Sequence, residues 1–316
     1  MNFRWYNDFI TPVSGRTGAI CVKKMLFVMN PYAGTRQGAK GAADIISIFN
    51  RADFEVQAYM TSSQGDAVRV TRERAGSVDL VVCAGGDGTF NETVTGILES
   101  GLDVPVGYIP CGSTNDFAAS LSLPTDVRKA AKEIVEGQPV AYDVGRFHDR
   151  YFSYVASFGA FTKASYATPQ NVKNALGHMA YILGGISELS QIRKEHIRIE
   201  LDEKVIEDDF IFGAVSNSTS MGGILTLDPK QVDMRDGKFE LLLVRAPKNL
   251  TEIGECLQAL QTQKYNCGMI TFLSAQKLKV YAKASMPWTL DGERADGREE
   301  IEIENLHHAI RLMQKE

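Results

Sequence analysis

VDLVVCAGGDGTFNETVTGILES, residues 78–100, runs from an apolar segment through a glycine loop into a helical segment. Residues 78–84 predict a buried strand, and residues 91–100 predict a helix. A glycine turn between the two leaves backbone N–H groups open to a phosphate, because glycine has no Cβ to block the approach. Asp87 inside the loop would repel phosphate unless a divalent cation lies between them. The run therefore predicts Mg²⁺–nucleotide chemistry, with ATP as the nucleotide.

The composition is that of an ordinary globular protein. A length of 316 residues allows two domains, each able to bury its own core. The net charge of −5 argues against a nucleic-acid-binding protein, although a local basic patch could still contact an anionic membrane. The five cysteines form no CxxC pair, which gives no zinc pattern and no disulfide framework and favours a reducing cytoplasm.

The first 24 residues differ from the rest of the chain. They carry charged residues around short apolar pieces and lack the hydrophobic core of a signal peptide. We expect a detachable leader here, with translation starting at Met25 as one hypothesis. No apolar run reaches the ~20 residues needed to span a bilayer, so we expect a cytoplasmic protein.

Strand and helix patterns alternate over the first half. Strands are expected at 26–29, 54–60, 78–84 and 104–109, and helices at 38–50, 64–75 and 91–100. Apolar strands that alternate with helices predict an α/β domain with a doubly wound, mostly parallel sheet covered on both faces. Ligands of such sheets bind beyond the carboxyl ends of the strands, where Asn30, Thr61, residues 85–89 and residues 110–115 fall.

The pattern changes from about residue 143. Paired strands are expected at 140–147 and 151–157, further strands at 196–201, 211–216, 239–244, 277–282 and 300–303, and helices at 171–192 and 250–261. Strand-rich sequence with turn signals predicts a larger, β-rich domain, either a sandwich or a barrel.

Three further motifs allow two interpretations each. Residues 112–118 (GSTNDFA) are either a capped helix start or a second wall of the nucleotide site, and their place on the next strand favours the wall. Residues 290–293 (LDGE) are either a hairpin turn with two exposed carboxylates or the source of a general base for a substrate hydroxyl. The acidic turn at residues 233–238 is either a hard-cation site or a solvated loop.

Taken together and in this order, the motifs resemble the diacylglycerol kinase catalytic family, and within it the soluble bacterial diacylglycerol kinases. Sphingosine and ceramide kinases are more distant members of that family. The resemblance covers essentially everything after the leader, and it implies a first domain similar to NAD kinases and phosphofructokinases, in which a bare GGDG also occurs.

The resemblance implies specific site residues. Contacts with ATP are implied for Asn30, Pro31, Tyr32, Ala33, Gly34, Thr61, Gly86, Asp87, Gly88, Thr89, Phe90, Asn91, Glu92 and Ser113. An acidic network that organises catalytic Mg²⁺ is implied for Asp87, Asp116 and Asp143, and Glu293 matches the proton acceptor. A structural Mg²⁺ site is implied for the Asp236 carboxylate with the backbone carbonyls of Asp233 and Lys238. Thr35 stands where many relatives carry lysine, so Arg36 or another cation would have to neutralise the phosphates.

The implied reaction is Mg²⁺-dependent transfer of the ATP γ-phosphoryl group to the primary hydroxyl of diacylglycerol, giving phosphatidic acid. The nucleotide would bind a catalytic domain at 25–143, to which residues 306–316 return, and the lipid would bind a domain at 144–305. The alternatives are a kinase of a sphingoid base or of phosphatidylglycerol, an NAD kinase, and a non-catalytic nucleotide- or lipid-binding regulator.

The resemblance also implies a homodimer, and a lipid substrate implies peripheral contact with the inner face of the membrane. Basic residues that either face anionic headgroups or are merely solvated are Arg193, Lys194, Lys277, Lys279 and Lys283.

Overall fold

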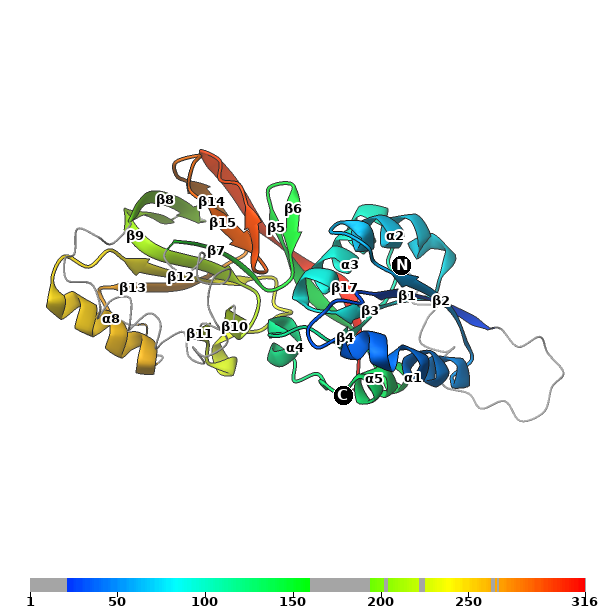
Figure 1. Cartoon of the computed structure of the whole chain (residues 1–316). Coiled ribbons are helices and arrows are strands. Elements are labelled where there is room, and N and C mark those ends of the chain that lie inside the picture. The colour runs from blue at the N-terminus through cyan, green and yellow to red at the C-terminus, as the bar shows by residue number, and fades with distance from the viewer. Residues whose placement is uncertain are drawn as a thin grey trace.

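The computed structural model describes residues 22–159, 194–201, 204–221, 225–262, 265 and 267–315. Figure 1 shows two lobes, an α/β lobe that carries the N-terminal half and a β-rich lobe that carries most of the remainder. Most of the expected leader, the expected helix at 171–192 and Arg193 lie outside the described residues.

The α/β lobe is built on a parallel sheet in the order β4-β3-β1-β2. Its strands are β1 (Lys23–Met29), β2 (Phe54–Met60), β3 (Leu80–Gly85) and β4 (Val106–Pro110). Its helices are α1 (Gln37–Arg51), α2 (Asp66–Arg74), the short η1 (Ala75–Ser77), α3 (Asp87–Ser100), α4 (Asp116–Ser120) and α5 (Val127–Glu136). Helices α2 and α3 cover one face and α1 and α5 the other (Figure 1), so every residue of β3 is buried. This is the doubly wound arrangement that the alternation predicts.

The β-rich lobe is antiparallel. Its elements are β6 (Arg150–Phe152), β7 (Val155–Gly159), β8 (Glu195–Leu201), β9 (Lys204–Ser216), β10 (Ser220–Met221), β11 (Leu225–Thr226), η3 (Pro229–Gln231), β12 (Phe239–Arg245), α8 (Leu250–Thr262), β13 (Ile270–Ala275), β14 (Lys277–Tyr281), β15 (Trp288–Leu290) and β16 (Glu293–Ala295). Strand β9 is central, because it pairs with β7, β8 and β12. The predicted β-rich second domain is therefore confirmed.

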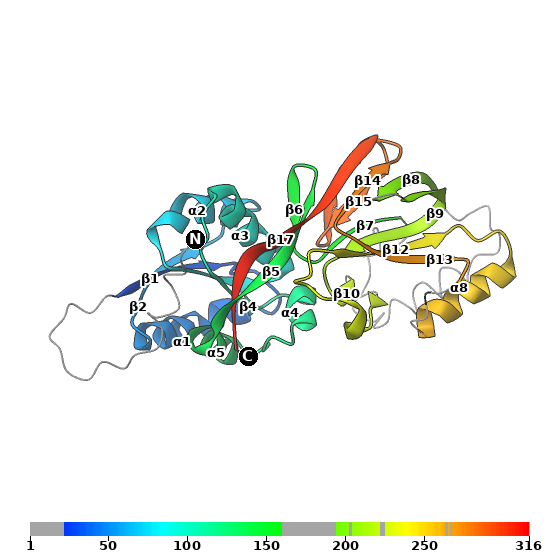
Figure 2. The same ribbon diagram turned by 180° about the vertical axis from the view of Figure 1, so that it is seen from behind.

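Two long strands join the lobes. β5 (Gln138–Phe147) and β17 (Glu300–Gln314) pair antiparallel with each other, and β17 also pairs with β14 at one end and with β4, at Leu312, near the other. Figure 2 shows β17 passing from the β-rich lobe into the α/β lobe, with the C-terminus close to α5. The expected domain boundary at residues 143–144 falls inside β5, a strand that both lobes share.

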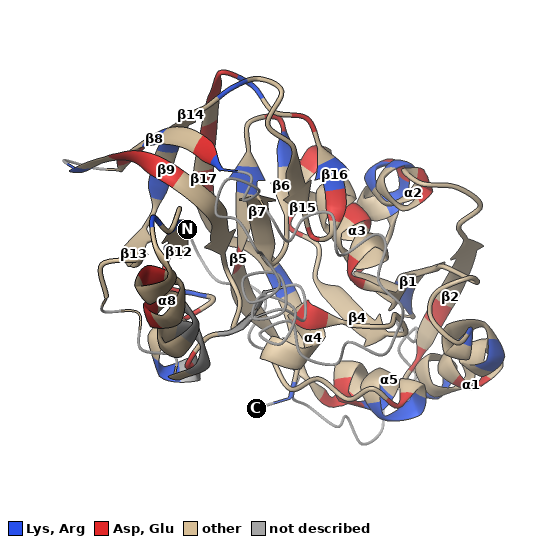
Figure 3. Cartoon of the chain, turned by 60° about the vertical axis from the view of Figure 1, so that its left-hand side comes forward, with Lys and Arg blue, Asp and Glu red and all other residues tan. Residues whose placement is uncertain are grey.

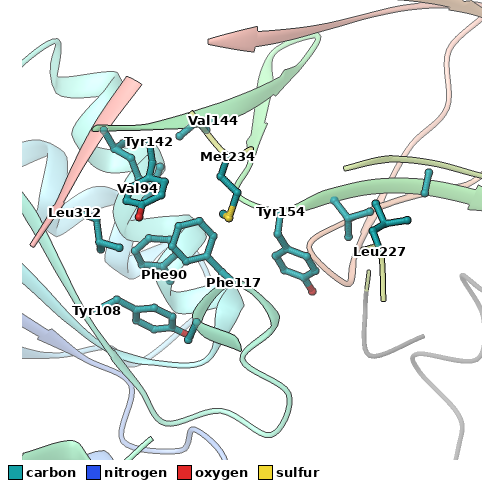
Figure 4. Close-up of a cluster of buried hydrophobic side chains, with 14 of the residues drawn as sticks. Phe90, Val94, Tyr108, Phe117, Tyr142, Val144, Tyr154, Leu227, Met234 and Leu312 are labelled. Atoms are coloured by element: carbon teal, nitrogen blue, oxygen red, sulfur yellow. The ribbon is translucent and has the colours of Figure 1, made fainter. Parts of the chain in front are cut away.

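The interface between the two lobes, here called the joint, is packed with aromatic rings. Phe90 stacks on Tyr108 with ring centroids 4.4 Å apart and lies 4.6 Å from the ring of Phe117. Figure 4 shows Met234 and Tyr154 continuing this cluster toward the β-rich lobe. Close packing of buried side chains resists deformation, so the two lobes are held in a defined relation around the space between them.

The outer strands of the β-rich lobe carry interleaved charges (Figure 3). Lys277 pairs with Glu302 at 3.0 Å, Lys279 with Glu300 at 3.3 Å, and Lys194 with Asp209 at 2.6 Å. Three of the lysines for which either membrane contact or plain solvation is expected therefore pair with carboxylates. Across the described helices, none combines the length and the apolar character that a bilayer crossing requires.

Candidate active site

A cleft of about 710 Å³ lies between the lobes, at the carboxyl ends of β1, β2 and β3. It brings together many of the residues predicted to contact ATP, together with the predicted base. Those lining it are Asn30, Tyr32, Ala33, Gly34, Thr61, Gly86, Gly88, Thr89, Glu92 and Glu293. Residues that line it without having been predicted to contact ATP are Ser62, Ser63, Gln64, Gly112 and Arg294. The cleft joins segments of both lobes, as a site between two substrates requires.

The first turn of α3 opens toward this cleft. The helix was expected from Asn91, but it starts at Asp87 because the glycine loop itself forms the first turn, with Gly86 as an extended N-cap. The backbone N–H groups of a first helical turn have no partner within the helix and attract anions. A Cβ on Gly86 would lie 3.2 Å from the Cα of Gly112, so the two loops approach as only glycines allow. These features fit the phosphates of ATP.

The loop after β1 forms the rim of the cleft. Asn30 accepts a hydrogen bond from the Tyr32 N–H at 2.9 Å and donates one to the Thr89 hydroxyl at 3.2 Å, which ties the loop to α3. The exposed ring of Tyr32 lies 5.8 Å from the Arg36 guanidinium. Arg36 therefore lies beside a cleft-lining residue, and its role in neutralising phosphates in place of a lysine at position 35 stays a prediction.

Not every predicted ATP contact reaches the cleft with its side chain. Phe90 is fully buried in the joint, so only its backbone is left for a nucleotide. Asn91 contacts the β-rich lobe, donating to the Tyr151 carbonyl and accepting from the Ser153 hydroxyl. Pro31, Asp87 and Ser113 do not line the cleft.

Asp87 braces a second helix. Its carboxylate accepts the backbone N–H of Asp116 at 3.0 Å and that of Phe117 at 3.3 Å, at the start of α4. Asp116 in turn accepts a hydrogen bond from the Ser220 hydroxyl of the β-rich lobe. Burial, followed by the charge of Asp116, raises the pKa of the Asp87 carboxyl to about 6. Two acidic groups this close fit a divalent cation, which would offset their charge.

Asp143, the third member of the predicted network, makes its hydrogen bonds with β17 and the acidic turn. Its fully buried carboxylate accepts the N–H of Gly237 at 2.7 Å, the N–H of His308 at 2.8 Å and Nδ1 of His307 at 3.1 Å. These bonds tie β5 to β17 and to the acidic turn. A role for Asp143 in catalysis stays a prediction.

The oxygens of the acidic turn take part in hydrogen bonds within the protein. The Asp236 carboxylate accepts the Lys238 N–H at 2.9 Å, and the Lys238 carbonyl accepts from Asn305 at 2.9 Å. Nearby Glu240 is 2% exposed, and within the described part of the chain its Oε2 has no hydrogen-bond partner. Burial, followed by the charge of Asp236, raises the pKa of Glu240 to about 8. A bound cation would offset the charge of Asp236 and supply a partner for Glu240, and a Mg²⁺ site at this turn stays a prediction.

The LDGE segment is the turn between β15 and β16. Asp291 and Gly292 both have positive φ, 50° and 83°, which aims the two carboxylates of the turn in different directions. The expectation of two exposed carboxylates is wrong for Asp291, which is 6% exposed and accepts the N–H groups of Ser153, Tyr154 and Val155. Burial raises the pKa of Asp291 to about 7, although these three N–H groups lower it.

Glu293 reaches across the cleft to the α/β lobe. Its Oε2 accepts a hydrogen bond from Gln64 Nε2 at 3.0 Å and lies 3.9 Å from Arg150. A Cβ on Gly88 would lie 3.1 Å from its Oε1, so the carboxylate stands over the first turn of α3. This position suits a group that takes a proton from an attacking hydroxyl.

The sequence did not predict three side chains that lie around Glu293: Gln64, Arg150 and Tyr154. Tyr154 is 3% exposed, between β6 and β7, and its residue type in an apolar run is typical of a core position. Burial raises its pKa well above the ordinary value, and the charges of Asp291 and Asp87 act in the same direction. The phenol therefore stays protonated among the site's carboxylates and can donate a hydrogen bond.

A helix N-terminus on an α/β lobe, faced by a carboxylate from a β-rich lobe across one cleft, is the arrangement that a two-domain phosphotransferase would need. Residues 24–147 match the diacylglycerol kinase catalytic domain, and residues 155–314 match the YegS C-terminal NAD kinase beta sandwich-like domain.

Known proteins are similar to this chain over most of its length. A diacylglycerol kinase of Bacillus subtilis is 32% identical over 294 residues, covering 92% of this chain and 96% of its own. One from Staphylococcus saprophyticus is 33% identical over 273 residues, covering 86% and 89%. A solved diacylglycerol kinase from Bacillus anthracis has a TM-score of 0.71 at 22% identity and covers 93% of this chain and 97% of its own, which establishes the fold. The chain belongs to the diacylglycerol kinase family. It is a kinase, and membership of a kinase family implies the use of ATP.

Proposed function

We propose that this kinase transfers the γ-phosphoryl group of ATP to the primary hydroxyl of diacylglycerol and releases ADP and phosphatidic acid. The observation that carries the proposal is the position of the Glu293 carboxylate over the first turn of α3. A hydroxyl between the two would have a base on one side and the phosphate-binding turn on the other. The relatives that this chain resembles are diacylglycerol kinases, which supports diacylglycerol as the acceptor.

In the proposed step, Glu293 accepts the proton of the lipid hydroxyl as its oxygen forms a bond to the γ-phosphorus. The bond from that phosphorus to the β–γ bridging oxygen breaks, and ADP leaves with the electron pair. The N–H groups of the first turn of α3 hold phosphate oxygens in place. Mg²⁺, when bound near Asp87 and Asp116, would neutralise charge on the transferring group. Positioning and charge neutralisation provide most of the catalysis in this class of reaction.

We propose that the lipid enters from the β-rich lobe while the protein is docked at the inner surface of the membrane. The ion pairs of Lys277 and Lys279 with Glu302 and Glu300 are exposed, and exposed pairs of this kind contribute little free energy. An anionic headgroup could therefore replace either glutamate at low cost. Equal binding to neutral and anionic vesicles would remove these lysines from the proposal.

A panel of acceptors tests the reaction. Purified protein is given Mg²⁺ and γ-labelled ATP with dioleoylglycerol, sphingosine, phosphatidylglycerol or NAD, and the labelled product is identified. We expect label in phosphatidic acid and its loss in Glu293→Gln, which keeps the size of the side chain. Label in another lipid or in NADP would show that this product's precursor, and not diacylglycerol, is the acceptor. No transfer to any acceptor, with ATP still bound, would favour a regulator.

A further inference from the structure

Strand β17 contains two neighbouring histidines whose rings lie on the same side. In a regular strand, successive side chains point to opposite faces. Here the register between β17 and β5 shifts between Leu306 and Ile310, and His308 takes a left-handed backbone conformation with φ 54°. The rings of His307 and His308 consequently stack, with centroids 3.7 Å apart and planes at 27°. The bulge thus gathers two imidazoles that a straight strand would separate.

A buried carboxylate completes this group. Asp143 of β5 is fully buried, and its Oδ1 lies 3.1 Å from Nδ1 of His307. One ring nitrogen of His308 lies within 4.8 Å of ligand atoms on both other residues. Bonds of about 2.0–2.2 Å in a tetrahedral zinc site place two donor atoms about 3.3–3.6 Å apart. The 3.1 Å between His307 and Asp143 is slightly shorter, so a small opening of this pair would admit an ion, and the exposed ring of His308 can turn to close the third bond.

The surroundings orient these ligands. The N–H groups of Gly237 and His308 donate to the two oxygens of Asp143, at 2.7 Å and 2.8 Å. Outer hydrogen bonds of this kind fix ligating carboxylates in metal sites. Gly237 has φ 77°, and a Cβ there would lie 3.2 Å from Nδ1 of His307. The turn therefore leaves room beside the nitrogen that would bind the ion, and the exposed sides of both rings leave room for water.

We propose that Asp143, His307 and His308 form a binding site for a divalent transition-metal ion of the zinc type. Two imidazoles and one carboxylate suit such ions, whereas Mg²⁺ prefers oxygen ligands throughout. The site is distinct from the all-oxygen set of Asp233, Asp236 and Lys238, although the same turn contacts both. On binding, Nδ1 of His307 exchanges its hydrogen bond to Asp143 for a bond to the metal, and the ring proton resides on Nε2. The ion would clamp β5 to β17, the two strands that join the lobes.

The test needs no kinase assay. The full chain is stripped of metal with a chelator and titrated with Zn²⁺ by calorimetry, in a buffer that does not bind metal and contains millimolar Mg²⁺. We compare the wild type with His307→Ala and His308→Ala. The matched control is His196→Ala, which removes another exposed histidine, one that lies 3.0 Å from Asp209 and 3.2 Å from Glu207.

We expect one Zn²⁺ site that survives Mg²⁺ and the His196 change, and that weakens about 100-fold or more in either β17 variant. Removing a residue that only supports a metal ligand typically lowers metal affinity about 10–100-fold, and removing a ligand itself should cost at least as much. Zn²⁺ should also raise the melting temperature of the wild type but not that of His308→Ala, whose own melting in the absence of metal shows that it folds. Unchanged Zn²⁺ affinity in both β17 variants would overturn the proposal, as would displacement of Zn²⁺ by Mg²⁺. The bulge would then be a hydrogen-bonded structural feature only.

Discussion

The first turn of α3 and the turn between β15 and β16 face each other across the cleft, but they hold their carboxylates differently. Asp87 is buried and accepts backbone N–H groups from α4, so it belongs to the framework of the α/β lobe. Glu293 is partly exposed and is held by side chains, Gln64 and Arg150, from other segments. Asp87 therefore contributes to folding as well as to the site, whereas Glu293 can be changed with little effect on the fold.

The largest effect on activity is expected for Glu293→Gln. A positioned base contributes about 10²–10⁴-fold to a rate, so the turnover should fall by that range while ATP binding is kept. Because the side chain is partly exposed and makes no hydrogen bond to the backbone of the described residues, the free energy of unfolding should change by no more than about 0.5 kcal/mol. Labelled-lipid turnover and urea denaturation measure the two quantities. A large loss of stability would erase the contrast with Asp87.

Asp87→Asn should reduce activity and stability together. Because Asp87 is proposed to hold Mg²⁺ together with Asp116, loss of its charge should lower turnover by about 10²–10³-fold, the range for removing one preorganised electrostatic interaction. Loss of an acceptor at the start of α4 should cost about 0.5–2 kcal/mol, as for an N-cap. The same two assays apply, with Asp126→Asn as the control, because Asp126 caps α5 away from the cleft. Equal stability of Asp87→Asn and wild type would show that the α4 contacts are incidental.

The buried carboxylate of the opposite turn should give the protein a measurable pH dependence. The pKa of Asp291 is raised to about 7 in the folded chain, against an ordinary value near 3.8. Between these values the folded state holds a proton that the unfolded state has released. The contribution is therefore fully present below about pH 4 and is lost as the pH rises through 7.

Denaturation in urea from pH 4 to 8, without Mg²⁺, measures this decline. Asp291→Asn, less stable by about 1–3 kcal/mol because one amide oxygen replaces two carboxylate oxygens as acceptors, should show a flatter pH profile. The difference between the two slopes isolates Asp291 from Asp87, whose raised pKa acts in the same direction. Parallel profiles would mean that Asp291 is ionised in the folded protein throughout this range.

Local patterns explain what the sequence could predict. Alternating apolar strands and helices predict the parallel sheet, because each strand is covered on both faces by its own neighbours in the chain. The glycine loop is equally local. Short strands such as β10 and β16 present too few residues for an alternating pattern, and the bulge at His307 hides the length of β17, of which only residues 300–303 were expected.

The rest of the site arises from contacts between distant segments. Gln64 meets Glu293 across 229 positions, and Asp291 is buried only because the Ser153–Val155 segment lies against its turn. Neither contact leaves a periodic pattern or a characteristic spacing in the sequence, so neither could be predicted from it. For Asp143 the family resemblance implied an acidic network, but its contacts depend on where β17 and the acidic turn are placed.

Gln64→Ala gives the smallest expected effect and the sharpest view of how Glu293 is held. The Gln64–Glu293 hydrogen bond is exposed and links the two lobes at 3.0 Å. A hydrogen bond to a charged group contributes at most about 1.5–3 kcal/mol, and exposure to water reduces this, so turnover should fall by about 3–10-fold. The KM for ATP should stay nearly constant, since the bond orients the base and not the phosphates. The same change in Glu293→Gln should add almost nothing, because the base is already absent there. A full additional loss in the double variant would show that Gln64 acts on the nucleotide directly and not through Glu293.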